Sequence, residues 1–358
     1  MRHFITVLFV CLCVSACAPV TRRPAVDDQK TSAEKELQRD MAFKERLKRQ
    51  ERADAVAFRI LTGAADLCEK QVKPSTGMRL IHNGMYKDEW SRSATKIIGK
   101  GPAPLVTNVA PQSPAQLAGV QPGDRILSIE NRTFSQSDSV QEALDAAMRS
   151  LEAGEATAIR IQRGEKEIEA QLTPVKACAY PVTVVDNDAV NAYADGKQII
   201  LTSGMMRFAQ DDNELGLVLG HELAHNTMGH LDKKRNNSLL GALLGAVISV
   251  GTGVDVTRLA GDLGSMAFSQ GFESEADYVG LYYAARAGFD VDNAPNFWRR
   301  MAVEHPQAIG HGTSHPDTAS RFLALEATSK EIAAKRTNGN PLHPERETLT
   351  ETPLPSGN

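Results

Sequence analysis

The segment HELAH at residues 221–225 constrains the fold more than any other part of the sequence. It lies in an apolar run that follows Asp211 and Asp212, which is typical of a helix with an acidic first turn. Residues four apart project from one face of a helix, so His221 and His225 can both reach one tetrahedral metal ion. The fold must then bring a second element against this helix to supply the third ligand and leave a fourth position open to water.

Glu222 follows the first of these histidines and is expected to lie beside the metal, not on it. A carboxylate in that place can take a proton from a water molecule whose pKa the metal lowers to about 7. The same five letters also arise by chance on amphipathic helices. A third ligand is therefore needed to distinguish a metal site from a helix that carries two histidines by accident.

His230 is the nearest candidate for a third ligand. One class of zinc protease uses the spacing HExxHxxGxxH, but this chain has Met228 and Leu231 where that spacing needs glycine and histidine. On a continuing helix, His230 is rotated by about 140° from His225. We therefore expect a residue at the surface or on the substrate side, outside the ligand set.

The segment ESEAD supplies a better third ligand. Glu273 and Asp277 are four residues apart, so one helix face can present both carboxylates. Glu273 would complete the metal site, and Asp277 would accept a hydrogen bond from a ligand imidazole. Glu275 is the rival ligand, but it lies about 200° around the helix from Glu273. Gly280 and Ala284 continue the same face with small residues that let a second helix pack closely.

These segments resemble the HtpX/BepA-like (CAAX-prenyl-protease-like) family of HExxH zinc metallopeptidases. HELAH, ESEAD and the stretch NAYADGKQIILTSGMMRF at 191–208 carry the resemblance. It implies an α+β fold, with a mostly helical gluzincin domain and a small β-sheet. It also implies one Zn²⁺ ion per chain, with Glu222 as general base, Asp277 hydrogen-bonded behind the ligands, and the metal held by His221, His225 and Glu273.

Two further expectations follow from the resemblance. The family places an edge strand beside the bound peptide, here near Ile199–Thr202. The segment SHPDTASRF resembles the family's HPxxxxR element. In related proteases the histidine, here His315, can approach the zinc and hold the enzyme at rest, while the arginine, here Arg321, lies near the reacting carbonyl. The alternative is that His315 only begins a helix and Arg321 forms a surface ion pair.

Residues 86–175 show short β-type runs broken by glycine and proline, and we expect a separate β-rich domain there. Its central segment, SPAQLAGVQPGDRILSIEN, places Ser113 as a helix cap and Pro114 in the first turn. This order resembles a PDZ domain, which adds a peptide strand to a sheet edge and holds its carboxylate with backbone N–H groups. We assign the carboxylate loop to GKGPAPLV. Pro102 and Pro104 have no N–H there, which puts carboxylate capture in doubt.

The N-terminus is typical of an exported lipoprotein. A short apolar run ends in VSAC, and this run is below the ~20 residues that a bilayer span needs. We expect cleavage before Cys17 and acylation of that cysteine, which would hold the protein on a membrane. Ala18 follows, which favours the outer membrane. The alternative is an ordinary signal peptide that happens to carry a cysteine.

Two cysteines, Cys68 and Cys178, would remain in the mature chain besides Cys17. An exported pair favours a disulfide, and the alternative is two unrelated buried thiols.

The apolar stretch at 238–261 is interrupted by Asp255 and Arg258 and is expected to be a buried or partly mobile helix near the active site, not a membrane span. We expect the following divisions: a signal peptide at 1–16, a lipid-anchored tether and helix at 17–55, the N-terminal part of the peptidase body at 56–85, a PDZ-like domain at 86–175, a zinc metallopeptidase domain at 176–330 and a disordered tail at 331–358.

Two features argue against nucleic-acid binding. The net charge of −4 has the wrong sign for binding phosphate groups, and the sequence has no basic stripe with interleaved aromatic residues. The sequence therefore predicts a zinc endopeptidase of the bacterial envelope that cleaves unfolded or misassembled proteins. A competing prediction is a PDZ-bearing adaptor or chaperone-like lipoprotein with a closed or structural zinc site. A zinc-free fold is the third possibility.

Overall fold

The computed structural model describes residues 24–134, 139–234, 236, 257–304 and 319–345. The predicted signal peptide with Cys17, most of the apolar stretch at 238–261, and His315 lie outside the described residues. The chain divides into two compact units, Met1–Ala42 and Phe43–Asn358. In the first unit the described residues form the beginning of helix α2 (Asp28–Gly63), where Leu37 and Met41 are exposed.

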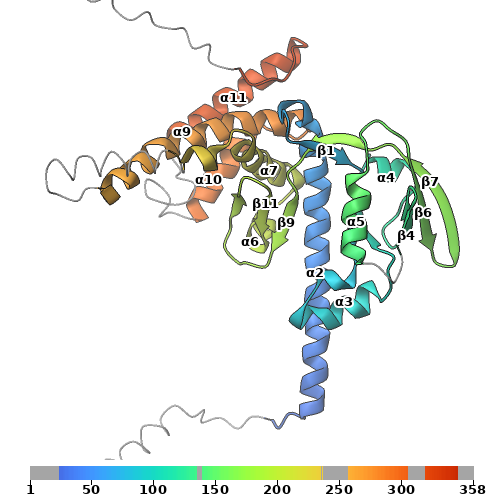
Figure 1. The fold of residues 1–358 in the computed structure, drawn as a ribbon. Helices are drawn as coiled ribbons and strands as arrows, with labels where there is room; N and C mark the ends of the chain where they lie inside the picture. Colours follow the sequence, from blue (N-terminus) through green and yellow to red (C-terminus); the bar gives the residue numbers. More distant parts are fainter. Residues whose placement is uncertain (1–23, 135–138, 235, 237–256, 305–318, 346–358) are drawn as a thin grey trace, which may run out of the picture. The chain divides into compact units, whose positions relative to one another are not determined.

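The second unit contains a β-rich domain built on a six-stranded sheet (Figure 1). Its strand order is β2-β3-β4-β6-β7, every pair is antiparallel, and β5 pairs with β4. The strands are β2 (Met78–Ile81), β3 (Leu105–Val109), β4 (Arg125–Ile129), β5 (Arg132–Thr133), β6 (Thr157–Arg163) and β7 (Lys166–Leu172). The helices are α3 (Ser91–Ile98), α4 (Pro114–Leu117) and α5 (Val140–Arg149), with short 3₁₀ helices η2 (Asn83–Met85) and η3 (Asp88–Trp90).

Local sequence signals explain these elements. Ser113 caps α4, because its hydroxyl accepts a hydrogen bond from the backbone N–H of Gln116 at 3.3 Å, and Pro114 begins the helix, as predicted. Gly119 follows with φ +80°, a left-handed conformation that glycine adopts without steric cost. The sheet starts at Met78, earlier than the boundary at residue 86 expected from the sequence.

The predicted carboxylate loop of the PDZ-like domain is misplaced. GKGPAPLV leads into β3, which lies inside the sheet between β2 and β4. The open edge near a helix is β2, and a cavity of about 680 Å³ between β2 and α5 is lined by Met78, Leu80, Leu144 and Met148 among others. Pro102 and Pro104 therefore lead into an interior strand and do not begin the edge strand β2.

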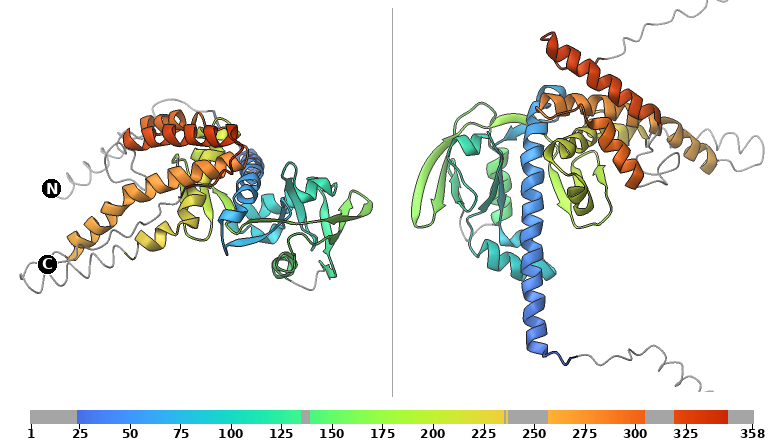
Figure 2. Two further views of the ribbon diagram at one scale, coloured as in Figure 1. Left: turned by 90° about the horizontal axis from the view of Figure 1, so that it is seen from above. Right: turned by 180° about the vertical axis from the view of Figure 1, so that it is seen from behind.

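A second, mostly helical core contains a small three-stranded sheet in the order β10-β11-β9. The strands are β9 (Val182–Val185), β10 (Ala192–Ala194) and β11 (Ile199–Thr202). The helices are α6 (Ser203–Phe208), α7 (Asp212–Thr227), α9 (Thr257–Arg286), α10 (Ala294–Glu304) and α11 (Ala319–Thr337). The second half of α2 joins this core through buried Val56 and Ile60. Figure 2 shows α11 beside α9 in this helical core.

The predicted edge strand is in the middle of this sheet, so that prediction is wrong. β11 pairs antiparallel with β10 and parallel with β9. The outer side of β9 is occupied by Gln50, which accepts from Val184 N at 2.8 Å and donates to Val182 O at 3.1 Å. Among the described strands of this three-stranded sheet, β10 is therefore the edge that remains for a peptide.

A two-stranded ribbon connects the two cores. β1 (Val72–Ser75) pairs antiparallel with β8 (Val175–Cys178), and the 3₁₀ helix η1 (Ala65–Leu67) precedes it. Cys68 and Cys178 form a disulfide with a Cα–Cα distance of 5.6 Å. The PDZ-like domain is thus an insertion whose two ends are joined by the ribbon and the disulfide.

The C-terminal helix extends beyond the expected start of the tail. α11 continues to Thr337, and Ile332 is fully buried. The prediction of disorder from residue 331 is therefore wrong for residues 331–337, because an apolar helix face continues there into the core. No helix among the described residues is long and apolar enough to span a membrane.

Candidate metal centre

Helix α7 carries HELAH into the interior of the helical core. Asp211 caps its first turn, with a carboxylate oxygen that accepts from Glu214 N at 2.9 Å. This confirms the predicted capped, acidic helix start. His221 is 2% exposed and Glu222 is 3% exposed. The local sequence thus places a polar pair inside a core, where it needs partners from another helix.

Helix α9 supplies these partners because it can approach α7 very closely. A Cβ added to Gly220 would lie 2.5 Å from the carbonyl oxygen of Gly280. Ala284, one turn further, is fully buried. The small-residue face predicted for α9 therefore lies against α7, and this close packing brings Glu273 and Asp277 to the histidines.

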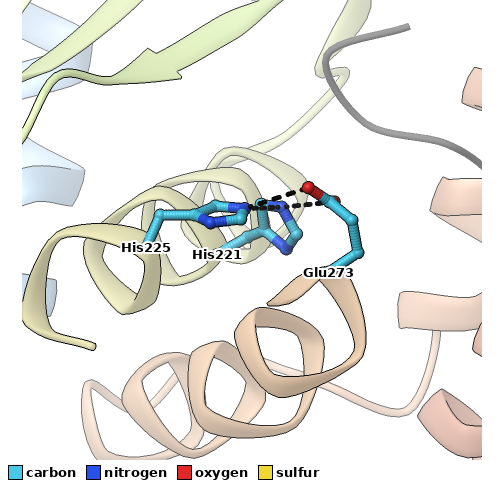
Figure 3. Close-up of side chains that lie close together, drawn as sticks. All are labelled: His221, His225 and Glu273. Carbon is cyan, nitrogen blue, oxygen red and sulfur yellow. Dashed lines mark hydrogen bonds and ion pairs between the residues drawn. The ribbon is translucent and has the colours of Figure 1, made fainter. Parts of the chain in front are cut away.

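The side chains of His221, His225 and Glu273 converge on one point (Figure 3). The two Nε2 atoms are 3.0 Å apart. Glu273 Oε2 lies 3.4 Å from His221 Nε2, and Glu273 Oε1 lies 3.4 Å from His225 Nε2. Three ligands at the usual zinc bond lengths of about 2.0–2.2 Å are roughly 3.3 Å from one another in a tetrahedron. The donor set and its spacing therefore fit a zinc ion.

Asp277 and Arg321 support this cluster from behind. His221 Nδ1 lies 3.0 Å from Asp277 Oδ1. Arg321 donates from Nε and Nη2 to the two carboxylate oxygens of Asp277, at 2.7 and 2.9 Å. Its Nη1 lies 3.3 Å from Glu273 Oε2. Arg321 is 3% exposed, so the alternative of a surface ion pair is wrong. Its predicted contact with a reacting carbonyl stays a prediction.

The charges of the cluster attract a cation. Burial disfavours the charged form of His221, but Asp277 and Glu273 outweigh this effect and raise its pKa to about 10. Burial likewise acts to raise the pKa of Asp277, but Arg321 and His221 lower it overall. In the metal-free chain the proton on His221 balances the second carboxylate. When His221 is neutral, as a metal ligand must be, two buried carboxylates face one guanidinium, and a divalent metal ion would supply the missing positive charge.

His230 lies outside the ligand cluster, as expected, but it is buried and not at the surface. Helix α7 ends at Thr227, a turn with Gly229 at φ +64° follows, and residues 230–234 are helical again. His230 is 3% exposed and its Nδ1 lies 2.9 Å from Nδ1 of His225. Burial lowers its pKa. The rotation argument fails here because it assumes a helix that continues beyond Thr227.

Glu275, the rival ligand, lies beside His230 and outside the cluster, with Oε2 2.8 Å from His230 Nε2.

The sequence analysis did not identify Trp298 of α10 as part of the site. It is one of two tryptophans in the chain, and its ring centroid lies 5.1 Å from that of His221. Its rarity in the chain was the only available signal.

Comparisons with known proteins identify the domains. Residues 157–329 match peptidase family M48, and residues 105–163 match the PDZ domain. A "Beta-barrel assembly-enhancing protease" of Yersinia pestis is 33% identical over 135 residues, which is 33% of this chain and 27% of that protein. A "Mitochondrial metalloendopeptidase OMA1" of Arabidopsis thaliana is 26% identical over 167 residues, 46% of this chain and 34% of that protein.

Among solved structures, the HtrA3 PDZ domain bound to a phage-derived ligand is 24% identical, covers 29% of this chain and 88% of that one, and has a TM-score of 0.22. The chain spans about a quarter of the length of the β-barrel assembly-enhancing protease that it matches. The two family matches overlap at residues 157–163, the strand β6 that belongs to the PDZ sheet in the fold.

Proposed function

Because the chain contains a metallopeptidase domain of family M48 and a PDZ domain, we propose that it is a zinc-dependent endopeptidase. The convergence of three ligand atoms from α7 and α9, separated by 3.0 to 3.4 Å, carries this proposal. Two histidines and one glutamate, with a position left for water, are the ligand set of a catalytic zinc site.

In this proposal zinc, when bound, supplies a Lewis acid that polarises the scissile carbonyl and acidifies water. Glu222 follows His221 on α7 and is the general base. It takes a proton from the attacking water and gives it to the leaving amine. Asp277 keeps His221 oriented through Nδ1, and Arg321 keeps Asp277 in place.

The edge strand β10 is the proposed site for the peptide backbone. Asn191 and Asp195 flank β10, and their backbone groups bond toward β11. The carbonyl oxygen of Asn191 accepts from Thr202 N, and Asp195 N donates to the carbonyl oxygen of Gln198. Strand alternation therefore directs the backbone polar groups of Ala192 and Ala194 outward. An extended segment that adds to this edge gains backbone hydrogen bonds.

Asn226 holds this edge next to the ligands. It directly follows His225 on α7, accepts from Gly196 N at 2.8 Å and donates to Gln198 O at 3.0 Å. The turn between β10 and β11 is therefore fixed to the helix that carries the histidines. Since unfolded proteins offer extended segments and folded ones do not, we propose unfolded or misassembled polypeptides as substrates.

The cellular setting is a further part of the proposal. The N-terminal sequence supports export and acylation at Cys17, which would attach the protein to the outer membrane on its periplasmic side. The name of the Yersinia relative refers to β-barrel assembly. We therefore propose envelope proteins as the substrate class, with the PDZ groove between β2 and α5 as a second place where a peptide strand adds.

The test is cleavage of casein by the purified full chain with zinc, beside Glu222→Gln and Glu326→Gln. Glu326 is an acid on α11 that pairs with Arg299 away from the cluster. We expect Glu222→Gln to abolish cleavage while elemental analysis still finds one zinc per chain, and Glu326→Gln to cleave normally. Equal activity of Glu222→Gln and the parent would refute the assignment of the base. A parent that binds zinc and cleaves nothing would favour the adaptor function.

A further inference from the structure

His230 lies beside the ligand cluster, in a place that the proposed mechanism does not use. The helix breaks at Gly229, and His230 Nδ1 lies 2.9 Å from Nδ1 of His225. On its other side, Nε2 meets Glu275 Oε2 at 2.8 Å. Phe272 stacks on the ring with centroids 4.7 Å apart and an interplanar angle of 18°. His230 therefore has a fixed position between a carboxylate and a ligand imidazole.

The directions of these two hydrogen bonds follow from the chemistry of the groups. A carboxylate accepts hydrogen bonds, so His230 donates from Nε2–H to Glu275. In a neutral imidazole the other nitrogen is then an acceptor. His230 Nδ1 therefore accepts from Nδ1–H of His225. This leaves the lone pair of His225 on Nε2, the atom that faces His221 and Glu273.

We propose that His230 is a positioning residue, held by Glu275, that fixes His225 in the tautomer and orientation needed to bind the metal. This inference rests on the proposed zinc site. It gives the two ligand histidines equivalent support: Asp277 contacts His221 directly at 3.0 Å, whereas Glu275 acts on His225 through His230. Removal of such supporting groups typically lowers metal affinity or activity 10–100-fold.

Four substitutions distinguish a positioning role of His230 from a role in which its side chain only fills space. His230→Leu removes the acceptor for His225, whereas His230→Asn keeps an amide oxygen near the place of Nδ1. Glu275→Ala removes the partner of His230, whereas Glu275→Gln keeps an acceptor and removes the charge. The Glu275 side chain is 44% exposed, so its loss does not threaten folding as a core substitution would. Ser274→Ala, at an exposed position beside it on α9, is the matched control.

The readouts are the affinity for Zn²⁺ by chelator competition, the melting temperature of the metal-free chain, and the ¹⁵N shifts of the His225 ring. We expect His230→Leu and Glu275→Ala to lose about 10–100-fold in zinc affinity, with smaller losses for His230→Asn and Glu275→Gln and none for Ser274→Ala. The His225 shifts should show Nδ1–H in the parent and a mixture of tautomers in His230→Leu.

Unchanged affinity in His230→Leu and Glu275→Ala would overturn the inference. So would reduced affinity with unchanged His225 shifts, because the role of His230 would then be structural only. A parent chain that binds no zinc would instead refute the proposed function. The ¹⁵N shifts of the metal-free chain still test the positioning of His225 in that case.

Discussion

The backbone of Gly280 lies directly against the backbone of His221. A Cβ added to Gly280 would lie 2.8 Å from both the Cα and the nitrogen of His221, a separation that side-chain atoms do not tolerate without a shift of one helix. Because Gly280 has no side chain, α9 can lie this close to α7. The distance between the histidines and Glu273 therefore depends on glycine at this position.

Gly280→Ala should push α9 away from the ligand histidines. Overpacking of this kind costs about 1–3 kcal/mol in free energy of unfolding, and we expect weaker zinc binding as well. Gly271→Ala is the control on the same helix, because a Cβ there meets nothing within 4 Å. Denaturant unfolding and zinc titration check both variants. A Gly280→Ala chain with normal stability and normal zinc affinity would contradict the close packing.

Arg321→Met should leave Asp277 as a buried carboxylate without its guanidinium partner. Breaking a buried ion pair by removing one partner costs about 3–5 kcal/mol. The double variant Arg321→Met with Asp277→Leu removes both charges, and we expect it to recover part of this stability. A double-mutant cycle measured by urea unfolding of the metal-free chain gives the coupling. Additive effects of the two substitutions would argue against a direct pair.

The stability of the metal-free chain should fall as the pH rises above neutrality. Asp277 and Glu273 outweigh burial and raise the pKa of His221 to about 10 in the folded chain, against an ordinary value of about 6.5. The folded state thus holds a proton that the unfolded state releases. Its stabilising effect is complete below about pH 6.5 and is lost as the pH approaches 10. Melting temperatures across this range should fall more steeply than those of His221→Gln. Parallel curves would contradict this.

Reduction of the Cys68–Cys178 disulfide should destabilise the protein. The bridge closes a loop with a sequence separation of 110 residues, and a disulfide typically contributes about 2–4 kcal/mol. A double substitution to alanine suits these two buried positions. Unfolding with and without reductant, beside the double variant, checks the expectation. An equal midpoint in all three samples would show that the bridge does not form in solution.

Backbone pairing at β10 predicts a characteristic response to substrate modification. A strand added to the edge bonds through every second residue. N-methylation of alternate amides in a peptide substrate should therefore raise KM strongly in one register and little in the other. Cleavage kinetics of the two methylated peptides provide the measurement. Equal effects of the two registers would mean that the peptide does not bind as an added strand.

Much of the candidate site could be predicted from local sequence. Asp211 as the helix cap, the four-residue spacing of His221 and His225, and the small face around Gly280 are all periodic signals within single helices. The strands of the PDZ domain follow from similar short patterns. These features depend on residues close together in the chain, so periodicity alone reveals them.

The features that the sequence did not reveal depend on contacts between distant segments. Periodicity identifies a strand but not its neighbours. The family resemblance places the edge strand near Ile199–Thr202, but β9 and β10 flank this strand on both sides. Likewise, Arg321 and Asp277 are far apart in the chain, and only the packing of α11 on α9 makes them a buried pair.

By itself, therefore, the sequence determined which side chains share a helix face and which chemistry those faces can support. Tertiary structure decided which faces meet. His230 shows the difference most clearly: helical rotation directs it away from the ligands, but the break in the helix at Gly229 and the carboxylate of Glu275 on another helix place it against His225. A periodic pattern contains no information about where a turn interrupts the helix.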